Sequence, residues 1–127
     1  MKVLVFDTET TGLPERYNIP YQQSHKWPHI VQFSFILYDL EKNKIINESD
    51  FIIDVAKDVV ISPESTKIHG ITHQISKNQG FDIKDILEIF QVCINAADYV
   101  VAHNINFDRN MILAECYRNK LHSMESM

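Results

Sequence analysis

The sequence predicts an α/β domain with a mixed sheet, and three features of its pattern lead to this prediction. The first half of the chain contains apolar runs and alternating segments typical of strands. The second half has apolar residues at helical spacing, and a short apolar segment separates two of its helices. Strands first, then helix–strand–helix, indicate a layered domain: an antiparallel three-strand meander followed by helix–strand–helix.

The meander is predicted from three segments. Lys2–Phe6 is apolar on both faces, which is typical of a strand buried centrally in a sheet. Thr11–His29 is polar and carries prolines, so we expect a long loop there. From Ile30 apolar and polar residues alternate as in a half-buried strand, and a turn over Asp39–Lys44 leads into a third strand, Lys44–Asp54.

Two helices are predicted from their end signals. Ser62 before Pro63 is a good N-cap, and Gly70 ends or bends the short helix that they open. Asp82 caps a longer helix. The apolar residues of this longer helix have helical spacing: Ile83, Ile86, Leu87, Phe90, Ile94 and Ala97.

The last predicted elements are a short buried strand over Tyr99–Ala102 and a helix from Asn106 onward. Phe33 and Phe35 alternate in a way that also suits a base-stacking platform, but we expect them to be core residues under the helices. The apolar stripe of the last helix is Ile112, Leu113, Cys116 and Tyr117.

Composition limits the classes of function. The chain has 127 residues, 45% of them hydrophobic, and a net charge of −5. This charge argues against binding nucleic acid through a broad basic surface, so contact with phosphate requires a metal or a local feature. Cys93 and Cys116 are expected as reduced core residues, and no signal peptide or membrane span is found. We therefore predict a cytoplasmic or nuclear protein that is not secreted and has no membrane partner.

Asp7 and Glu9 stand two residues apart at the end of the first predicted strand, so their side chains project from the same face. Two close carboxylates beside a core are costly to ionise, and a divalent cation such as Mg²⁺ or Mn²⁺ removes that cost. Two hydrated acids where a strand reaches solvent would give the same pattern.

Two longer motifs resemble a known family. Residues 6–14 read F-D-T-E-T-T-G-L-P, and residues 102–108 read A-H-N-I-N-F-D at the start of a helix. Together they resemble the first and second motifs of the DEDD, or DnaQ-like, 3′–5′ exonucleases, which have a ribonuclease-H-like fold. Residues 63–72, P-E-S-T-K-I-H-G-I-T, are similar to the family segment that approaches the terminal nucleotide.

The resemblance implies a role for each matching residue. Asp7, Glu9 and Asp108 would be the catalytic carboxylates that hold two Mg²⁺ or Mn²⁺ ions, and Leu13 would pack against the terminal base. The remaining nucleotide-binding candidates are the backbone around Thr8 and Thr10 and the side chains of Ser65, His69, Asn104 and Phe107. A zinc site at His69 and His73 is not favoured, because Gly70 interrupts their helical spacing.

The family's third motif carries a fourth carboxylate and the general base, which is His in one subgroup and Tyr in the other. Nineteen residues follow Asp108, and none of them is Asp. His122 and Glu125 stand three apart near the end of the chain and are not taken as substitutes. We therefore expect one incomplete exonuclease domain over residues 1–127, truncated before the last strand and helix, and poorly active alone.

The expected function is metal-dependent removal of nucleotides from DNA or RNA 3′ ends, for proofreading or trimming, by two-metal phosphodiester hydrolysis. The expected partners are a single-stranded 3′ end and either a DNA polymerase or a further C-terminal segment. The alternative is a catalytically degenerate exonuclease fold that binds nucleic-acid ends or a polymerase without cleavage.

Overall fold

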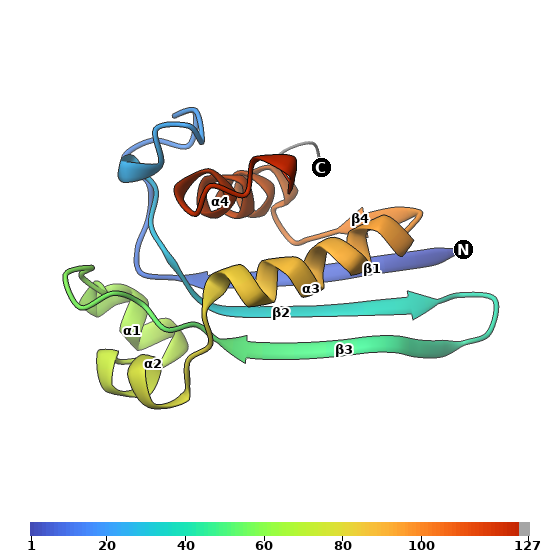
Figure 1. The fold of residues 1–127 in the computed structure, drawn as a ribbon. Coiled ribbons are helices and arrows are strands. Elements are labelled where there is room, and N and C mark those ends of the chain that lie inside the picture. Colours follow the sequence, from blue (N-terminus) through green and yellow to red (C-terminus); the bar gives the residue numbers. More distant parts are fainter. Residues whose placement is uncertain (125–127) are drawn as a thin grey trace.

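The computed structural model describes residues 1–124 and has a four-stranded sheet with helices on one face and at one end (Figure 1). The strands are β1 (Lys2–Thr10), β2 (Ile30–Asp39), β3 (Lys44–Ile52) and β4 (Tyr99–Val101). The α-helices are α1 (Pro63–His69), α2 (His73–Gln79), α3 (Ile83–Ala96) and α4 (Ile105–Arg118). Two 3₁₀ turns, η1 (Ser24–Lys26) and η2 (His122–Met124), complete the order.

The sheet is mixed, as predicted. Its strand order is β3-β2-β1-β4, in which β1 pairs antiparallel with β2 and parallel with β4. β3 pairs antiparallel with β2. The three-strand meander and the later helix–strand–helix are therefore confirmed, and β1 lies inside the sheet between β2 and the short β4.

β1 is longer than predicted. We expected the strand to end at Phe6, but Asp7 pairs with Ser34 and Glu9 pairs with Gln32, so the strand runs to Thr10. The prediction was wrong because it took the first acid as the end of the strand, whereas a polar side chain is tolerated wherever its face of the sheet is open to solvent.

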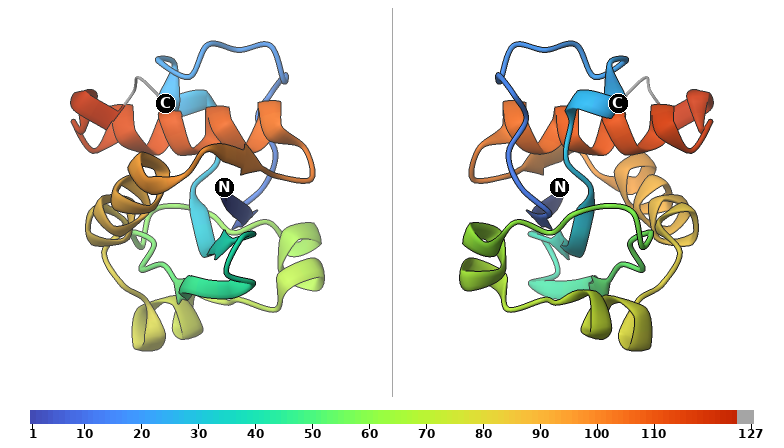
Figure 2. Two further views of the ribbon diagram at one scale, coloured as in Figure 1. Left: turned by 90° about the vertical axis from the view of Figure 1, so that its right-hand side faces the viewer. Right: turned by 90° about the vertical axis from the view of Figure 1, so that its left-hand side faces the viewer.

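Only one face of the sheet is covered. α3 and α4 pack on it (Figures 1 and 2), and Leu4 and Phe6 of β1 are buried beneath them. Val5 points to the opposite face and is 47% exposed. Val101 in β4 is also 47% exposed. The prediction of strands buried on both faces is therefore wrong for the described residues, since no element among residues 1–124 covers the second face.

The helix caps follow the sequence closely. The Ser62 hydroxyl accepts the amide proton of Ser65, and Gly70 adopts the left-handed conformation with φ 72° at the end of α1. The Asp82 carboxylate accepts the amide proton of Lys84. α2, which Thr72 caps, was not predicted.

The core is aromatic where the helices meet the sheet. Phe33 and Phe35 are 0% and 1% exposed, and the Phe90 ring of α3 lies 4.8 Å from that of Phe33. Both are core residues, as predicted. Cys93 and Cys116 are buried and form no disulfide. Tyr117 departs from its predicted stripe and is 38% exposed.

The described residues contain no helix whose length and apolar character would allow it to cross a membrane.

Candidate active site

A cavity of about 620 Å³ lies at the C-terminal end of β1, between that strand, α1 and the start of α4. It gathers seven of the ten site residues that the sequence predicts, although they come from three separate segments of the chain. The seven are Thr8, Glu9, Thr10, Leu13, Ser65, His69 and Phe107.

The end of β1 is shaped by an irregularity in its pairing. The register with β2 shifts between Glu9 and Thr10, so the regular pairing of the strand is interrupted there. The Thr10 hydroxyl then donates to the Gly12 carbonyl at 2.7 Å and turns the chain. This turn places Gly12 and Leu13 on the cavity wall beside Glu9.

His69 joins α1 to the end of β1. Its Nδ1 lies 2.9 Å from the Ile71 amide, and its Nε2 lies 3.0 Å from the Thr10 carbonyl. An amide only donates and a carbonyl only accepts, so Nδ1 is the acceptor and Nε2 carries the proton. Both ring nitrogens are therefore engaged, and His69 positions the cavity wall in this structure.

The carboxylates influence one another. Burial raises the pKa of Glu9, and the neighbouring Asp7 carboxylate raises it further. Burial also raises the pKa of Asp108, against the hydrogen bond from Thr8, and Asp7 adds to the increase. Asp7 itself is exposed on the open face of the sheet. These carboxylates disfavour one another's ionised forms. A divalent cation bound between them would stabilise the ionised forms, and carboxylate oxygens are the ligands that such cations prefer.

Asp108 is held away from the cavity. It is 4% exposed, and its Oδ1 accepts the Thr8 hydroxyl proton at 2.9 Å. Neither Asp7 nor Asp108 lines the cavity, and Asn104 does not either. Across residues 1–124, no three His, Cys, Asp or Glu side chains are gathered closely enough to hold a metal ion.

The cavity has apolar walls, one of which sequence reasoning missed. Leu13 is 74% exposed on one segment, and Ile68 is 78% exposed on another. Phe107 lines the same cavity and contacts the Tyr17 and Trp27 rings of the long loop, each at a centroid distance of 5.8 Å. The sequence signal for Ile68 is an apolar residue directly before His69 in a short polar helix.

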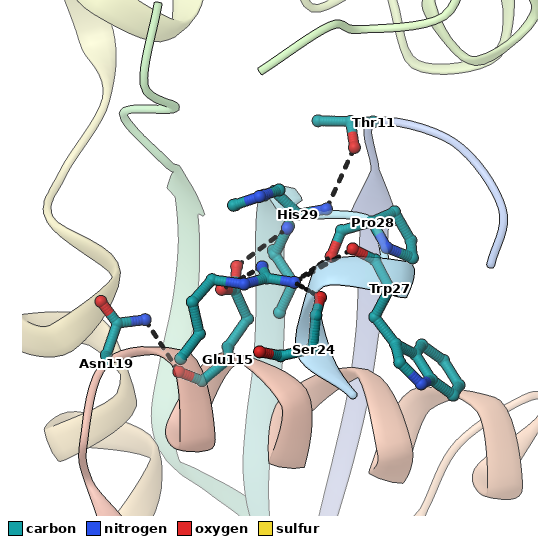
Figure 3. A network of polar contacts seen from close by, with 9 residues as sticks. Thr11, Ser24, Trp27, Pro28, His29, Glu115 and Asn119 are labelled. Carbon is teal, nitrogen blue, oxygen red and sulfur yellow. Dashed lines mark hydrogen bonds and ion pairs between the residues drawn. The ribbon is translucent and has the colours of Figure 1, made fainter. Parts of the chain in front are cut away.

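The long loop is fixed to α4 by a buried ion pair that the sequence did not reveal (Figure 3). Arg118 Nη1 lies 2.7 Å from Glu115 Oε1, and Glu115 is 2% exposed. Glu115 Oε2 also accepts the Ile30 amide proton at 3.0 Å. The second guanidinium nitrogen of Arg118 donates to three loop carbonyls, those of Ser24, Trp27 and Pro28.

This network reaches the cavity through the start of the loop. The Thr11 amide donates to the His29 carbonyl at 2.9 Å, and the His29 amide donates to the Thr11 hydroxyl at 3.0 Å (Figure 3). The Ser62 amide donates to the Thr11 carbonyl at 2.8 Å. Thr11 thus connects Arg118 and Glu115 with Gly12 and Ser62 at the cavity.

A family model described as RNase_T, exonuclease, matches residues 4–127. No curated protein matches the sequence significantly.

Solved structures of Exonuclease I are similar to this chain over 93% of its length. The Escherichia coli enzyme in complex with a dT13 oligonucleotide is 23% identical with a TM-score of 0.73, and its complex with dA16 is 23% identical with a TM-score of 0.74. A moderately thermophilic Exonuclease I from Methylocaldum szegediense is 27% identical with a TM-score of 0.73. This chain spans only 24% of each of those chains.

Proposed function

The chain belongs to the RNase T exonuclease family, and from this membership we propose that it removes nucleotides from single-stranded DNA or RNA 3′ ends by metal-dependent phosphodiester hydrolysis. The observation that carries the proposal is the cavity itself, in which exposed apolar walls stand beside the Glu9 carboxylate. A terminal nucleotide fits such a cavity, because its base can lie against the apolar walls and its anionic phosphate can bind a metal ion held by the carboxylate.

The base would lie against Leu13, Ile68 and Phe107. Leu13 and Ile68 are largely exposed although they are apolar, so covering them with a base removes apolar surface from water. The contacts of Phe107 with the loop aromatics hold that wall in place. No base-edge donor or acceptor is required, which suits an enzyme that acts on an end rather than on a sequence.

The sugar and phosphate would lie along the end of β1. Among the described residues, β4 pairs only with Val3, Leu4 and Val5, so the edge of β1 beyond Val5 carries no strand on the side away from β2. This leaves the backbone around Thr8 and Thr10 available to the substrate, apart from the Thr10 carbonyl that His69 occupies. Ser65 stands on the opposite wall.

Asp7, Glu9 and Asp108 are the residues that we propose to hold Mg²⁺ or Mn²⁺. Their mutual effect on pKa supports this assignment, because the ionised carboxylates require a nearby positive charge. When bound, two such ions supply a nucleophilic water and stabilise the leaving oxygen. The Thr8 hydroxyl engages only Oδ1 of Asp108, so Oδ2 is the oxygen that this carboxylate would offer to a cation.

The second candidate is an exonuclease fold that binds ends, or a DNA polymerase, without cleaving. The burial of Asp108 favours it, because this carboxylate is 4% exposed and does not line the cavity that Glu9 lines, so it is poorly placed to share a cation there. The polymerase itself, and a further C-terminal segment as partner, are predictions that rest on the family resemblance.

A degradation assay with a 5′-labelled single-stranded oligonucleotide and Mn²⁺ distinguishes the two candidates. A nuclease acting from the 3′ end produces a ladder of shortened labelled products. Glu9→Gln should lower the rate by about 10²–10³-fold, the loss typical of removing one electrostatic contact to the transition state. Glu48→Gln, an exposed strand glutamate outside the cavity, serves as the matched control. Binding of the oligonucleotide without any ladder would establish the second candidate and refute the first.

A further inference from the structure

A second cavity, of about 410 Å³, lies on the far side of the Thr11–His29 pairing from the candidate active site. Four basic side chains line it: Lys57, Lys77, Lys84 and Arg118. They are a third of the twelve lysines and arginines of a chain whose net charge is −5. Positive charge gathered in one hollow of an acidic chain attracts anionic ligands to that hollow.

The acids of this cavity neutralise only part of that charge. Glu115 is paired with Arg118 and accepts the Ile30 amide proton. Asp82 is occupied as the cap of α3, and Asp54 is exposed at the cavity. No ion pair within 4.0 Å joins the three lysines to any acid of residues 1–124. Their ammonium groups are therefore free to meet an anion.

A neighbouring hollow of about 360 Å³ extends the basic surface along α2. It shares Val55, Lys57 and Lys77 with the first and is lined by no acidic side chain. The residues that it adds are hydrogen-bonding ones: His73, Gln74 and Asn78. The two hollows together form a basic groove, defined by Lys57, Lys77, Lys84, Gln74 and Asn78.

The basic groove adjoins the candidate active site. His29 lines the cavity with the lysines, and Ser62 lines the cavity with Glu9. Thr11 separates them, since it bonds through its backbone to His29 on one side and to Ser62 on the other. Adjacent hydrogen-bonded backbones are about 4.8 Å apart, so the two cavities are divided by little more than one segment of chain.

From this juxtaposition we propose that the basic groove binds phosphates of the nucleic-acid strand upstream of its terminal nucleotide. The inference rests on the proposed function and adds a subsite to it. The cavity beside β1 carries Glu9 and Glu64, and so attracts a polyanion poorly without a cation. The lysines supply that attraction next to the point where the strand must continue. Ammonium groups bind phosphate as point charges without reading sequence, which suits an end-directed nuclease.

Binding of labelled oligothymidylates in Ca²⁺, followed by fluorescence anisotropy as a function of salt, tests the subsite. The variant is Lys57→Gln/Lys77→Gln/Lys84→Gln, in which all three side chains are exposed. Lys42→Gln/Lys44→Gln/Lys120→Gln is the control, because it removes the same charge from exposed lysines outside both hollows.

The groove variant should bind a decanucleotide at least about tenfold more weakly, and the slope of log K against log salt should fall in magnitude by about 2, at ~0.7 per lost phosphate contact. The control variant should change both quantities much less. Thymidine 5′-monophosphate, which has no phosphate upstream of its own nucleotide, should bind the groove variant nearly as well as the unmodified chain.

Equal losses in the two variants, or an equal loss for thymidine 5′-monophosphate, would overturn the subsite while leaving the proposed function intact. If neither the decanucleotide nor thymidine 5′-monophosphate binds the unmodified chain, the proposed function fails, and the subsite with it. If the groove variant loses binding of a deca-glutamate peptide but keeps its affinity for the decanucleotide, the groove serves an acidic peptide and the proposal is wrong.

Discussion

Single side chains at the end of β1 are held by contacts that reach far along the sequence. Thr8 donates to Asp108, 100 residues away, and His69 bonds to Thr10, 59 residues away. Thr8 and Asp108 belong to two different short motifs, and their hydrogen bond brings these motifs together in space. The bond between His69 and Thr10 does the same for α1 and the end of β1. The carboxylates are near enough to raise the pKa values of Glu9 and Asp108, which makes the electrostatic coupling measurable.

Removing the Asp7 charge should lower the pKa values of both Glu9 and Asp108, because Asp7 contributes to both increases. In Asp7→Asn, the free energy of unfolding without metal should rise by less than ~1 kcal/mol. The rise of Tm with Mn²⁺ should disappear. NMR titration of the carboxyl carbons and thermal unfolding check these effects, with Glu48→Gln as the control. Unchanged pKa values in Asp7→Asn would show that the acids do not form one cluster.

His29 makes stability depend on pH. Burial, together with the nearby Arg118 charge, lowers its pKa from the ordinary value of 6.5 to about 4. The unfolded chain therefore gains this proton before the folded chain does, and stability is lost as the pH falls from about 7 toward 4. Because the ring is partly exposed, solvent screening limits the effect to about 1–2 kcal/mol.

Urea unfolding at several pH values checks this prediction. Between pH 7 and pH 4, the free energy of unfolding of His29→Gln should fall by about 1–2 kcal/mol less than that of the unmodified chain. Parallel pH curves for the two proteins would show that the imidazole does not carry the effect.

Among the secondary-structure elements, α4 unites the two halves of the domain. Its first turn brings Phe107 to the cavity and Asp108 to Thr8, and its last turn brings Arg118 to the loop. Since Glu115 is 2% exposed, its charge is compensated, among residues 1–124, by Arg118 and the Ile30 amide. The C-terminal end of α4 therefore holds in place the long loop, whose first residues include Gly12 and Leu13.

Arg118→Met should destabilise the fold by about 3–5 kcal/mol, the cost of leaving a buried charge without its partner. Glu115→Gln/Arg118→Met should recover part of that loss, because no uncompensated charge remains. Chemical denaturation of the single and double variants measures the coupling. A loss below about 1 kcal/mol in Arg118→Met would mean that the pair is no more valuable than a surface ion pair.

For the domain as a unit, local signals were predictable, whereas burial was predictable for Phe33 and Phe35 but not for every apolar side chain of the strands. The caps at Ser62 and Asp82 follow from neighbouring residues, and both are observed. The exposure of Val5 depends on which elements cover a sheet face, and residue types alone do not encode that coverage. The same reason explains why Ile68 and the Glu115–Arg118 pair were missed, since their roles arise from segments that meet only in the fold.

The candidate site was predictable where its residues belong to local motifs and not where their roles depend on distant segments. The two motifs identified Glu9, Leu13 and Phe107, which the fold brings to one cavity, because each motif lies at the end of a strand or the start of a helix. The sequence analysis predicted that the His69 side chain contacts the substrate. In the structure both of its ring nitrogens are hydrogen-bonded within the protein, and the bond to the Thr10 carbonyl, 59 residues away, could not be predicted from the local motif. Glu125, considered with His122 for the missing carboxylate, lies outside the described residues.

The most direct test of the proposed site is the structure of the chain with Mn²⁺ and thymidine 5′-monophosphate, the product expected from a thymidine end. The base should lie between Leu13, Ile68 and Phe107, and the phosphate should meet Mn²⁺ held by Asp7 and Glu9. A nucleotide bound elsewhere, with the cavity beside β1 empty and no Mn²⁺ on those carboxylates, would contradict the assignment of this cavity as an exonuclease active site.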